Sequence, residues 1–244
     1  MDLIAADWPA PPGVKAVATT RRGGVSLPPY DSLNLGANTD DDPSGVAANR
    51  QRLCERAGLP EAPRWLRQVH GTRVVAARDV IPDNTEADAQ WTAEVGVVLA
   101  VLTADCLPVV LCDDAGGEIA VAHAGWRGLS AGILEATAAT FARPPERLMA
   151  WLGPAIGPQR YEVGDAVRDA FLAADPAAEA AFRPARPGHW WADLYQLARQ
   201  RLAAAGVAAV YGGGLCTAGE PERFFSHRRD GPTGRLGTLI WREG

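Results

Sequence analysis

The sequence predicts a mixed-sheet α/β layer fold in a single domain spanning residues 1–244. Three apolar segments, 96–103, 108–112 and 118–123, are nearly continuous, as expected for buried strands. Predicted strands and helices are mixed along the chain without strict alternation, which favours mixed sheets over a purely parallel one. A chain of 244 residues with no internal repeat can bury one large core without disulfides.

The N-terminal part carries a predicted strand, a turn and a helix. Residues 14–20 alternate and are rich in β-formers, so they predict a strand that ends in the turn 21–24. Ser44 is the predicted N-cap of a helix over 45–57, and Gly58 is expected to end that helix.

The remaining elements are predicted from apolar periodicity and from the positions of Gly and Pro. They comprise strands at 64–69, 73–77, 148–152, 207–211 and 236–241, and helices at 127–142, 164–174 and 193–205.

The composition argues against several classes of protein. Lys and Arg number 24 against 29 Asp and Glu, so a net charge of −5 gives no electrostatic reason to expect a nucleic-acid partner. No apolar run approaches the roughly 18 residues of a membrane span, so no membrane partner is expected either. The first residues lack the basic and apolar regions of a secretory signal, and we therefore predict a cytoplasmic protein.

Residue counts narrow the possible chemistry further. Lys15 is the only lysine, so a P-loop or Schiff-base lysine is not expected, and anions would bind arginine or backbone N–H groups. The four cysteines are far apart and indicate free thiols or metal ligands: Cys54, Cys106, Cys112 and Cys216. The four histidines suffice for one small metal site but not for a laccase-type copper cluster: His70, His123, His189 and His227.

Polar residues follow three of the predicted buried strands. The segments are Arg67–Gly71, Leu102–Pro108 and Val121–Gly128, and they contain His70, Cys106 and His123 respectively. Because ligand sites in open α/β sheets gather at strand ends, these three segments are candidates to meet in one place.

The residue types leave three kinds of chemistry open. Two imidazoles and one thiolate form a three-ligand set for Zn²⁺, with a fourth position open to water or substrate. Without metal, Cys106 is a candidate nucleophile and His123 its base. Copper is the third possibility, although neither Met1 nor Met149 lies near a motif to serve as an axial ligand.

These motifs resemble the YfiH-type family, whose members have been called laccase-domain or polyphenol oxidase proteins and are now described as purine nucleoside phosphorylases. The resemblance covers nearly the whole chain in the same order, through 20–26, 32–36, Asn49-Arg50, 68–71, 103–108, 122–128, 152–157 and 225–230.

The resemblance implies a single α/β/β/α layered domain with zinc held by His70, Cys106 and His123. It also implies phosphorolysis of adenosine, inosine, guanosine and methylthioadenosine, with adenosine deamination as a side activity. The expected partners are therefore purine nucleosides and phosphate, for a monomer or homodimer. Cysteine deamidases share this fold and have a Cys–His pair at the positions of Cys106 and His123, so a metal-free hydrolase or deamidase remains an alternative. A copper-dependent polyphenol oxidase is the other.

Three arginines are candidates for binding phosphate. Arg50 is preferred from the resemblance and because a guanidinium suits an oxyanion, Arg21 lies in a predicted turn, and Arg127 lies where the helix after 118–123 begins. Asp105, beside Cys106, is a candidate for proton transfer or for orienting a ligand. His227 could reach the substrate or the zinc from a loop, but beside two arginines it is expected to be exposed to solvent.

Overall fold

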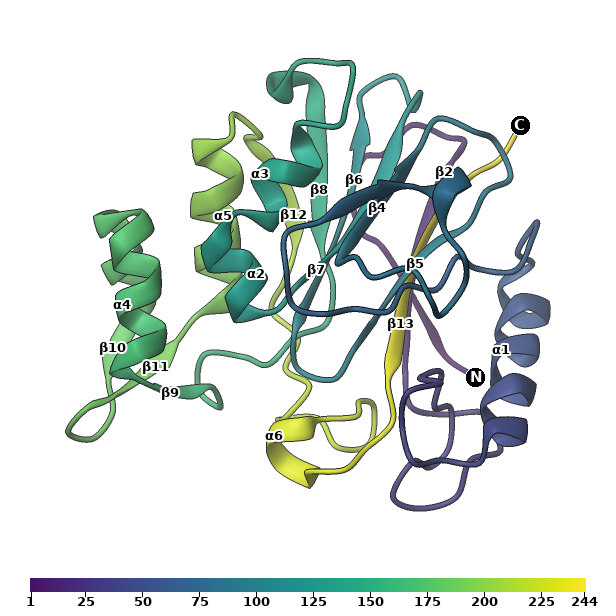
Figure 1. Cartoon of the computed structure of the whole chain (residues 1–244), viewed down its shortest axis with the longest axis horizontal. Helices are drawn as coiled ribbons and strands as arrows, with labels where there is room; N and C mark the ends of the chain where they lie inside the picture. The colour runs from purple at the N-terminus through teal and green to yellow at the C-terminus, as the bar shows by residue number, and fades with distance from the viewer.

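A computed structural model describes residues 1–244 and places the chain in four layers, helices on either side of two stacked sheets (Figure 1). The larger sheet has six strands in the order β12-β8-β6-β7-β4-β3. Its outer pairs, β12–β8 and β4–β3, are parallel and its inner pairs are antiparallel. The strands are β3 (Val74–Ala76), β4 (Ala89–Thr92), β6 (Leu107–Asp113), β7 (Ile119–Ala124), β8 (Leu148–Leu152) and β12 (Ala209–Gly212).

The second sheet is antiparallel throughout and has the order β1-β2-β13-β5. Its strands are β1 (Leu3–Ala5), β2 (Val14–Thr19), β5 (Leu99–Thr103) and β13 (Leu236–Arg242). The two sheets bury an apolar layer between them that includes Val101, Val110, Val121 and Ile240. A smaller antiparallel sheet, β10-β11-β9, is formed by Phe182–Pro184, His189–Ala192 and Glu162–Gly164.

Helices cover the outer faces of both large sheets. On the six-stranded sheet lie α2 (Trp126–Ala131), α3 (Ile133–Ala138) and α5 (Leu194–Ala204), and on the far side lies α1 (Pro43–Ala57) (Figure 1). Helix α4 (Asp165–Ala174) packs against α2 and the small sheet β10-β11-β9 (Figure 1). Short helices complete the fold: η1 (Ala77–Asp79), η2 (Pro145–Arg147), η3 (Pro176–Ala181) and α6 (His227–Asp230). The predicted α/β/β/α architecture is thus confirmed. None of the helices is long and apolar enough to cross a membrane.

Two helix predictions are wrong in part, one at the start of the helix and the other in its middle. Helix α1 is capped by Asp42, whose carboxylate accepts a hydrogen bond of 3.1 Å from the Ser44 amide, so Ser44 is not the N-cap. Pro43 can occupy the first helical position because the amide there has no intrahelical partner. The predicted helix over 127–142 is instead the pair α2 and α3, because Gly132 between them has a left-handed φ of 101°.

The predicted strand at 64–69 is wrong, although the segment is bound to the sheets. It makes only isolated bridges, and the Gln68 side chain takes the place of a strand ladder. Its amide donates to the carbonyl of Leu102 at 2.8 Å and accepts from the amide of Leu102 at 2.7 Å. The strand predicted at 96–103 begins later, at Leu99, because Gly96 has a left-handed φ of 82°. Strands β1, β4, β9, β10 and β11 were not predicted.

Candidate metal centre

The fold brings His70, Cys106 and His123 together. Their possible ligand atoms all lie within 4.8 Å of one another, and Cys106 Sγ is 3.9 Å from His70 Nε2. His123 belongs to β7, Cys106 lies in the turn between β5 and β6, and His70 lies in the loop before β3. The antiparallel pairing of β6 with β7 places the start of one beside the end of the other, which brings Cys106 to His123.

A buried carboxylate, Asp88, holds both histidines in place. Asp88 Oδ1 accepts hydrogen bonds from His123 Nδ1 at 2.8 Å and from the His70 amide at 2.9 Å, and Oδ2 accepts from the Gly71 amide at 2.7 Å. Because Asp88 occupies Nδ1 of His123, Nε2 is the nitrogen that faces Cys106 and is free to bind a metal. Asp88 was not predicted from the sequence, because it precedes a strand that was not predicted and lies in none of the three motifs.

Two of the residues around the cluster adopt left-handed backbone conformations that non-glycine residues rarely take. His70 has φ 61° and Asp105 has φ 90°. The Asp105 carboxylate accepts hydrogen bonds of 2.6 Å from the Thr217 hydroxyl and from the Arg228 amide. These bonds hold the turn that carries Cys106 against helix α6, so Asp105 is placed to fix the position of Cys106.

Gly125 leaves just enough room for the cluster. A Cβ atom on Gly125 would lie 2.9 Å from His70 Cδ2, 3.1 Å from Cys106 Sγ and 3.4 Å from His123 Cε1. Its φ of −62° is accessible to any residue, so the need for glycine is steric rather than conformational. Gly125 is therefore needed in the motif 122–128 to leave space for the three side chains of the cluster.

Cys106 and His123 shift each other's pKa in opposite directions. Burial alone would raise the pKa of the Cys106 thiol, but the charge of His123 and hydrogen bonds from both imidazoles outweigh it and lower the pKa to about 6. Burial alone would lower the pKa of His123, but the negative charge of Cys106 and the bond to Asp88 raise it to about 9. Without metal, the pair is a thiolate beside an imidazolium, which is the reactive form of a cysteine nucleophile.

The donor set fits a zinc ion. Zn–S bonds of about 2.3 Å and Zn–N bonds of about 2.0–2.1 Å put ligands of one tetrahedral ion roughly 3.3–3.6 Å apart. The 3.9 Å between Cys106 and His70 is only slightly wider, within the reach of an exposed loop histidine. Three protein ligands are typical of catalytic zinc sites, whereas structural sites use four. The same residues also offer ligands for copper.

The cluster opens into a pocket of about 380 Å³. His70, Cys106 and His123 form part of its wall, and the other lining residues come from the N-terminal loops, from β5 and its end, and from the segment around α6: Gly36, Asn38, Thr39, Leu66, Gln68, Leu102, Thr103, Ala104, His227 and Arg235. A ligand in this pocket would therefore reach the metal-binding side chains directly.

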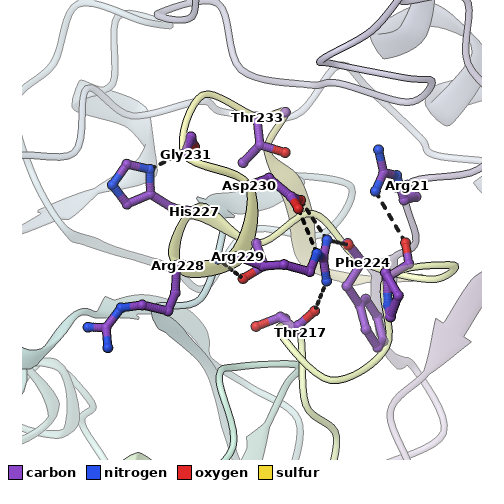
Figure 2. Close-up of polar contacts among 12 residues, drawn as sticks. Arg21, Thr217, Phe224, His227, Arg228, Arg229, Asp230, Gly231 and Thr233 are labelled. Carbon is purple, nitrogen blue, oxygen red and sulfur yellow. Dashed lines mark hydrogen bonds and ion pairs between the residues drawn. The ribbon is translucent and has the colours of Figure 1, made fainter. Parts of the chain in front are cut away.

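Helix α6 turns its side chains in different directions. Figure 2 shows Arg229 pointing inward, where it donates to the carbonyl of Thr217 at 2.8 Å and of Phe224 at 2.9 Å. His227 points away from these residues, and its Nδ1 is 2.9 Å from the carbonyl oxygen of Gly231 (Figure 2). His227 is exposed, as expected from the sequence, and it also lines the pocket.

The structure does not bring the three predicted phosphate ligands to this pocket. Arg50 forms a two-pronged ion pair with Asp83, at 2.6 and 2.9 Å. Arg21 is engaged by Asp31, at 2.8 Å to its carbonyl and 3.3 Å to its carboxylate. Arg127 is exposed and lies over the ring of its neighbour Trp126. The guanidinium that does line the pocket is Arg235, which the sequence analysis did not single out.

A second cleft, of about 720 Å³, contains none of the three cluster residues. Its walls include Trp126, Tyr161, Arg160 and Arg228, together with His189 at the start of β11. His189 resembles His227 in that its Nδ1 also lies near a backbone carbonyl, that of Pro187 at 3.1 Å.

The chain is similar to known proteins over nearly its whole length. Residues 15–243 match the family model described as multi-copper polyphenol oxidoreductase laccase. The chain is 55% identical to a purine nucleoside phosphorylase of Pseudomonas aeruginosa, with 96% of each covered, and 54% identical to purine nucleoside phosphorylase YfiH of Escherichia coli, with 98% of each covered. A crystal structure of a Neisseria meningitidis protein of family DUF152 is 48% identical, with a TM-score of 0.96 and complete coverage of both chains.

Proposed function

We propose that this chain, which belongs to the family of YfiH-type purine nucleoside phosphorylases, is a zinc enzyme that cleaves purine nucleosides with phosphate. In this reaction a phosphate oxygen forms a bond to the C1′ atom of ribose while the bond from C1′ to the purine nitrogen breaks. The purine leaves with its electron pair and gains a proton. Adenosine and phosphate thus give adenine and ribose 1-phosphate.

The observation that carries this proposal is a three-ligand centre facing an open pocket. His70, Cys106 and His123 would hold the zinc, which supplies Lewis-acid polarisation when bound. Asp88 fixes the tautomer and orientation of His123 through Nδ1, and Gly125 leaves the space in which the three side chains meet. The pocket of about 380 Å³ has room for a substrate beside the centre.

The resemblance also supports finer proposals. The substrates would be adenosine, inosine, guanosine and methylthioadenosine, and adenosine would in addition react with water to give inosine and ammonia. Arg50, Arg21 and Arg127 remain predictions from the sequence as phosphate ligands, although none of the three lines the pocket beside the centre. Cys106, His123 and Asp105 form the proposed catalytic set. The structure supports Arg50 least, because Asp83 already occupies its guanidinium.

A phosphate-dependence assay tests the proposal. Zinc-loaded protein should release adenine from adenosine only when phosphate is present, with an equal amount of ribose 1-phosphate. The control omits phosphate, which leaves only the deamination to inosine. Metal-replete protein that releases no base with phosphate would contradict the proposed function.

The Cys106–His123 pair supports a second candidate, a metal-free thiol hydrolase or deamidase. In that reaction His123 Nε2 takes the Cys106 proton and the thiolate attacks an amide carbonyl carbon. The C–N bond then breaks as His123 returns the proton to the leaving amine, and water hydrolyses the thioester to free the thiol. A Cys106→Ala variant separates the two candidates: joint loss of zinc and phosphorolysis indicates the metal centre, while retained zinc with lost activity indicates the thiol nucleophile.

The description of the matching family model supports a third candidate function, copper-dependent polyphenol oxidation, which would transfer electrons from a phenol to oxygen. Oxygen uptake with a phenol, measured before and after copper is removed, tests it. If phosphorolysis persists when copper and oxygen uptake are gone, oxidation is not the main activity.

A further inference from the structure

One wall of the cluster pocket carries polar groups that the fold leaves without partners. Thr103 lines the pocket and is 2% exposed, yet its Oγ1 atom forms no hydrogen bond. Burying a hydroxyl without a partner is unfavourable, and it occurs in proteins mainly where a ligand or water completes the bonding. Because Thr103 also lines the pocket, its hydroxyl is free to form a hydrogen bond to a ligand bound there.

Arg235 lies next to Thr103 across the sheet. Thr103, the last residue of β5, pairs with Leu236, the first residue of β13, so Arg235 is adjacent to that pair. Arg235 is half-buried and forms no ion pair with a carboxylate. Of its guanidinium nitrogens, only Nη1 is bonded, to the carbonyls of Thr233 at 2.7 Å and Gly234 at 3.2 Å. The others remain free to donate to an anion.

His227, which also lines the pocket, has one ring nitrogen that donates a hydrogen bond and one that is left to accept. The carbonyl oxygen of Gly231 can only accept, so the 2.9 Å contact requires the proton of neutral His227 to be on Nδ1. Nε2 is then the free nitrogen, and it accepts hydrogen bonds. A partly protonated phosphate offers both kinds of group, anionic oxygens for a guanidinium and a P–OH for an imidazole acceptor.

We propose that Thr103, Arg235 and His227 form the site that binds inorganic phosphate in the cluster pocket. This inference rests on the proposed function for the role of phosphate as co-substrate. Arg235 supplies the charge-assisted bonds, the Thr103 hydroxyl donates a third bond, and His227 accepts from the P–OH group. All three line the pocket that contains the metal-binding side chains, so phosphate would be held next to the bond that breaks.

The sharpest test uses a pair of threonine variants. Thr103→Val removes an unpartnered hydroxyl and keeps the side-chain shape, so the fold should be retained or slightly stabilised. Thr233→Val is the matched control, because Thr233 is also 2% exposed with an unpartnered Oγ1 but does not line the pocket. Its contact with Arg235 is made by the main-chain carbonyl, which the substitution keeps. We expect Thr103→Val to raise the KM for phosphate by about 10-fold, the range of one hydrogen bond to a charged group, and Thr233→Val to leave it unchanged.

A second pair tests the guanidinium. Arg235→Met keeps the stem that packs against Gly36 and should raise the KM for phosphate more than Thr103→Val does, with zinc content unchanged. Arg228→Met is its control, since Arg228 lies in the larger cleft. For the imidazole, His227→Ala should weaken phosphate binding and His189→Ala should not.

Direct binding of inorganic phosphate, measured by calorimetry on the same proteins, separates this inference from the proposed function. If the wild type binds phosphate and the pocket variants lose that binding, the site is supported even if no nucleoside is cleaved. The inference is overturned if Thr103→Val and Arg235→Met bind phosphate like wild type. It is equally overturned if Arg50→Met, Arg21→Met or Arg127→Met is the variant that loses binding.

Discussion

The two ends of strand β6 contain the same chemical groups and use them differently. Cys106 precedes the strand and Cys112 lies near its other end, and each end has a buried aspartate, Asp88 or Asp113. Beside two imidazoles, the pKa of Cys106 falls to about 6. Burial, reinforced by the negative charges of neighbouring aspartates, raises the pKa of Cys112 to about 12. The same thiol is thus a reactive ligand at one end and an inert core residue at the other.

The two aspartates also share one structural device. Asp113 accepts hydrogen bonds from the amides of Ala115 at 2.7 Å and Glu118 at 2.5 Å, which closes the turn between β6 and β7. Asp88 accepts hydrogen bonds from the amides of Val69, His70 and Gly71 in the same way at the opposite end, but this loop carries His70, and the ring of His123 donates a fourth bond. A carboxylate that organises a loop becomes part of a site only because that loop carries an imidazole.

The largest expected difference between the ends is in the thiols. Cys106→Ala removes one of the three proposed metal ligands and should abolish the proposed stoichiometric zinc binding together with the proposed phosphorolysis. Cys112→Ala only leaves a small cavity in the core, which should lower the free energy of unfolding by about 1 kcal/mol with zinc content unchanged. Elemental analysis and chemical denaturation measure the two effects. Zinc retained at full occupancy in Cys106→Ala would remove the proposed ligand set.

The aspartates give the next largest effect. Asp88→Asn keeps the shape of the side chain but replaces a charged acceptor of the His123 ring, so zinc affinity should fall by roughly 10- to 100-fold. Asp113→Asn should destabilise the fold by about 1–3 kcal/mol through weakened amide bonds, without changing zinc affinity. Competition with a chelator measures zinc affinity in both variants. Equal zinc affinities would mean that Asp88 acts on the fold alone.

The sequence was sufficient for the elements that apolar patterns define. The buried strands around β6 and β7 and their polar ends were predicted because continuous apolar runs stop abruptly at Cys106 and His123. The predicted meeting of these ends with His70 is what the structure contains. The segment 64–69 misled the prediction, because the side chain of Gln68 makes bonds that a strand backbone would otherwise make.

The missing parts of the site are those that only tertiary contacts define. Arg50 was predicted to bind phosphate from the resemblance and from its guanidinium, and Arg235 was not predicted; in the structure Asp83, 33 positions away, occupies the Arg50 guanidinium. Asp88 has no local signal either, and Thr103 lies in the motif 103–108 without a feature that sets it apart. Their importance comes from what they face or lack in the folded chain: two histidines for Asp88, and no partner at all for Thr103.

A glycine exchange tests how closely the Cys106 end is packed. Gly125→Ala introduces a methyl group 2.9 Å from His70 and 3.1 Å from Cys106, so the exposed His70 loop must shift and zinc affinity should fall roughly 10-fold, which is about 1.4 kcal/mol. Gly45→Ala, in α1, is the control, since its nearest atom would be 3.8 Å away and alanine favours the helix. Unchanged zinc affinity in Gly125→Ala would show that the cluster is looser than its geometry indicates.

The smallest expected effect is on the rate of thiol alkylation in protein stripped of metal. At pH 7 a pKa of about 6 makes Cys106 roughly 90% thiolate, against roughly 1% for a thiol at the ordinary 9.0. A thiolate of lower pKa is roughly 15- to 30-fold less nucleophilic, so the net gain in rate is only about 3- to 6-fold. The position of the pH profile is therefore more diagnostic than the rate: Cys106 should reach its plateau above about pH 7, while Cys112 should stay unreactive until the protein unfolds.

The pH dependence of the free energy of unfolding shows whether Cys106 titrates alone or together with His123. Between about pH 6 and 9 the Cys106 thiol carries no proton in the folded protein but carries one in the unfolded chain. Cys106 alone therefore makes the free energy of unfolding rise with pH over this range, and its contribution is lost as the pH falls through 6. His123, raised from 6.5 to about 9, holds a proton in the folded state that the unfolded chain has lost, so its contribution declines as pH rises through 9. The two slopes cancel, and the free energy of unfolding of the metal-free protein should be nearly level from about pH 6.5 to 9. In His123→Gln the cancelling group is gone and Cys106 returns toward an ordinary pKa, so alkylation should lose its early plateau; an early plateau that survives in this variant would show that the thiolate does not depend on His123.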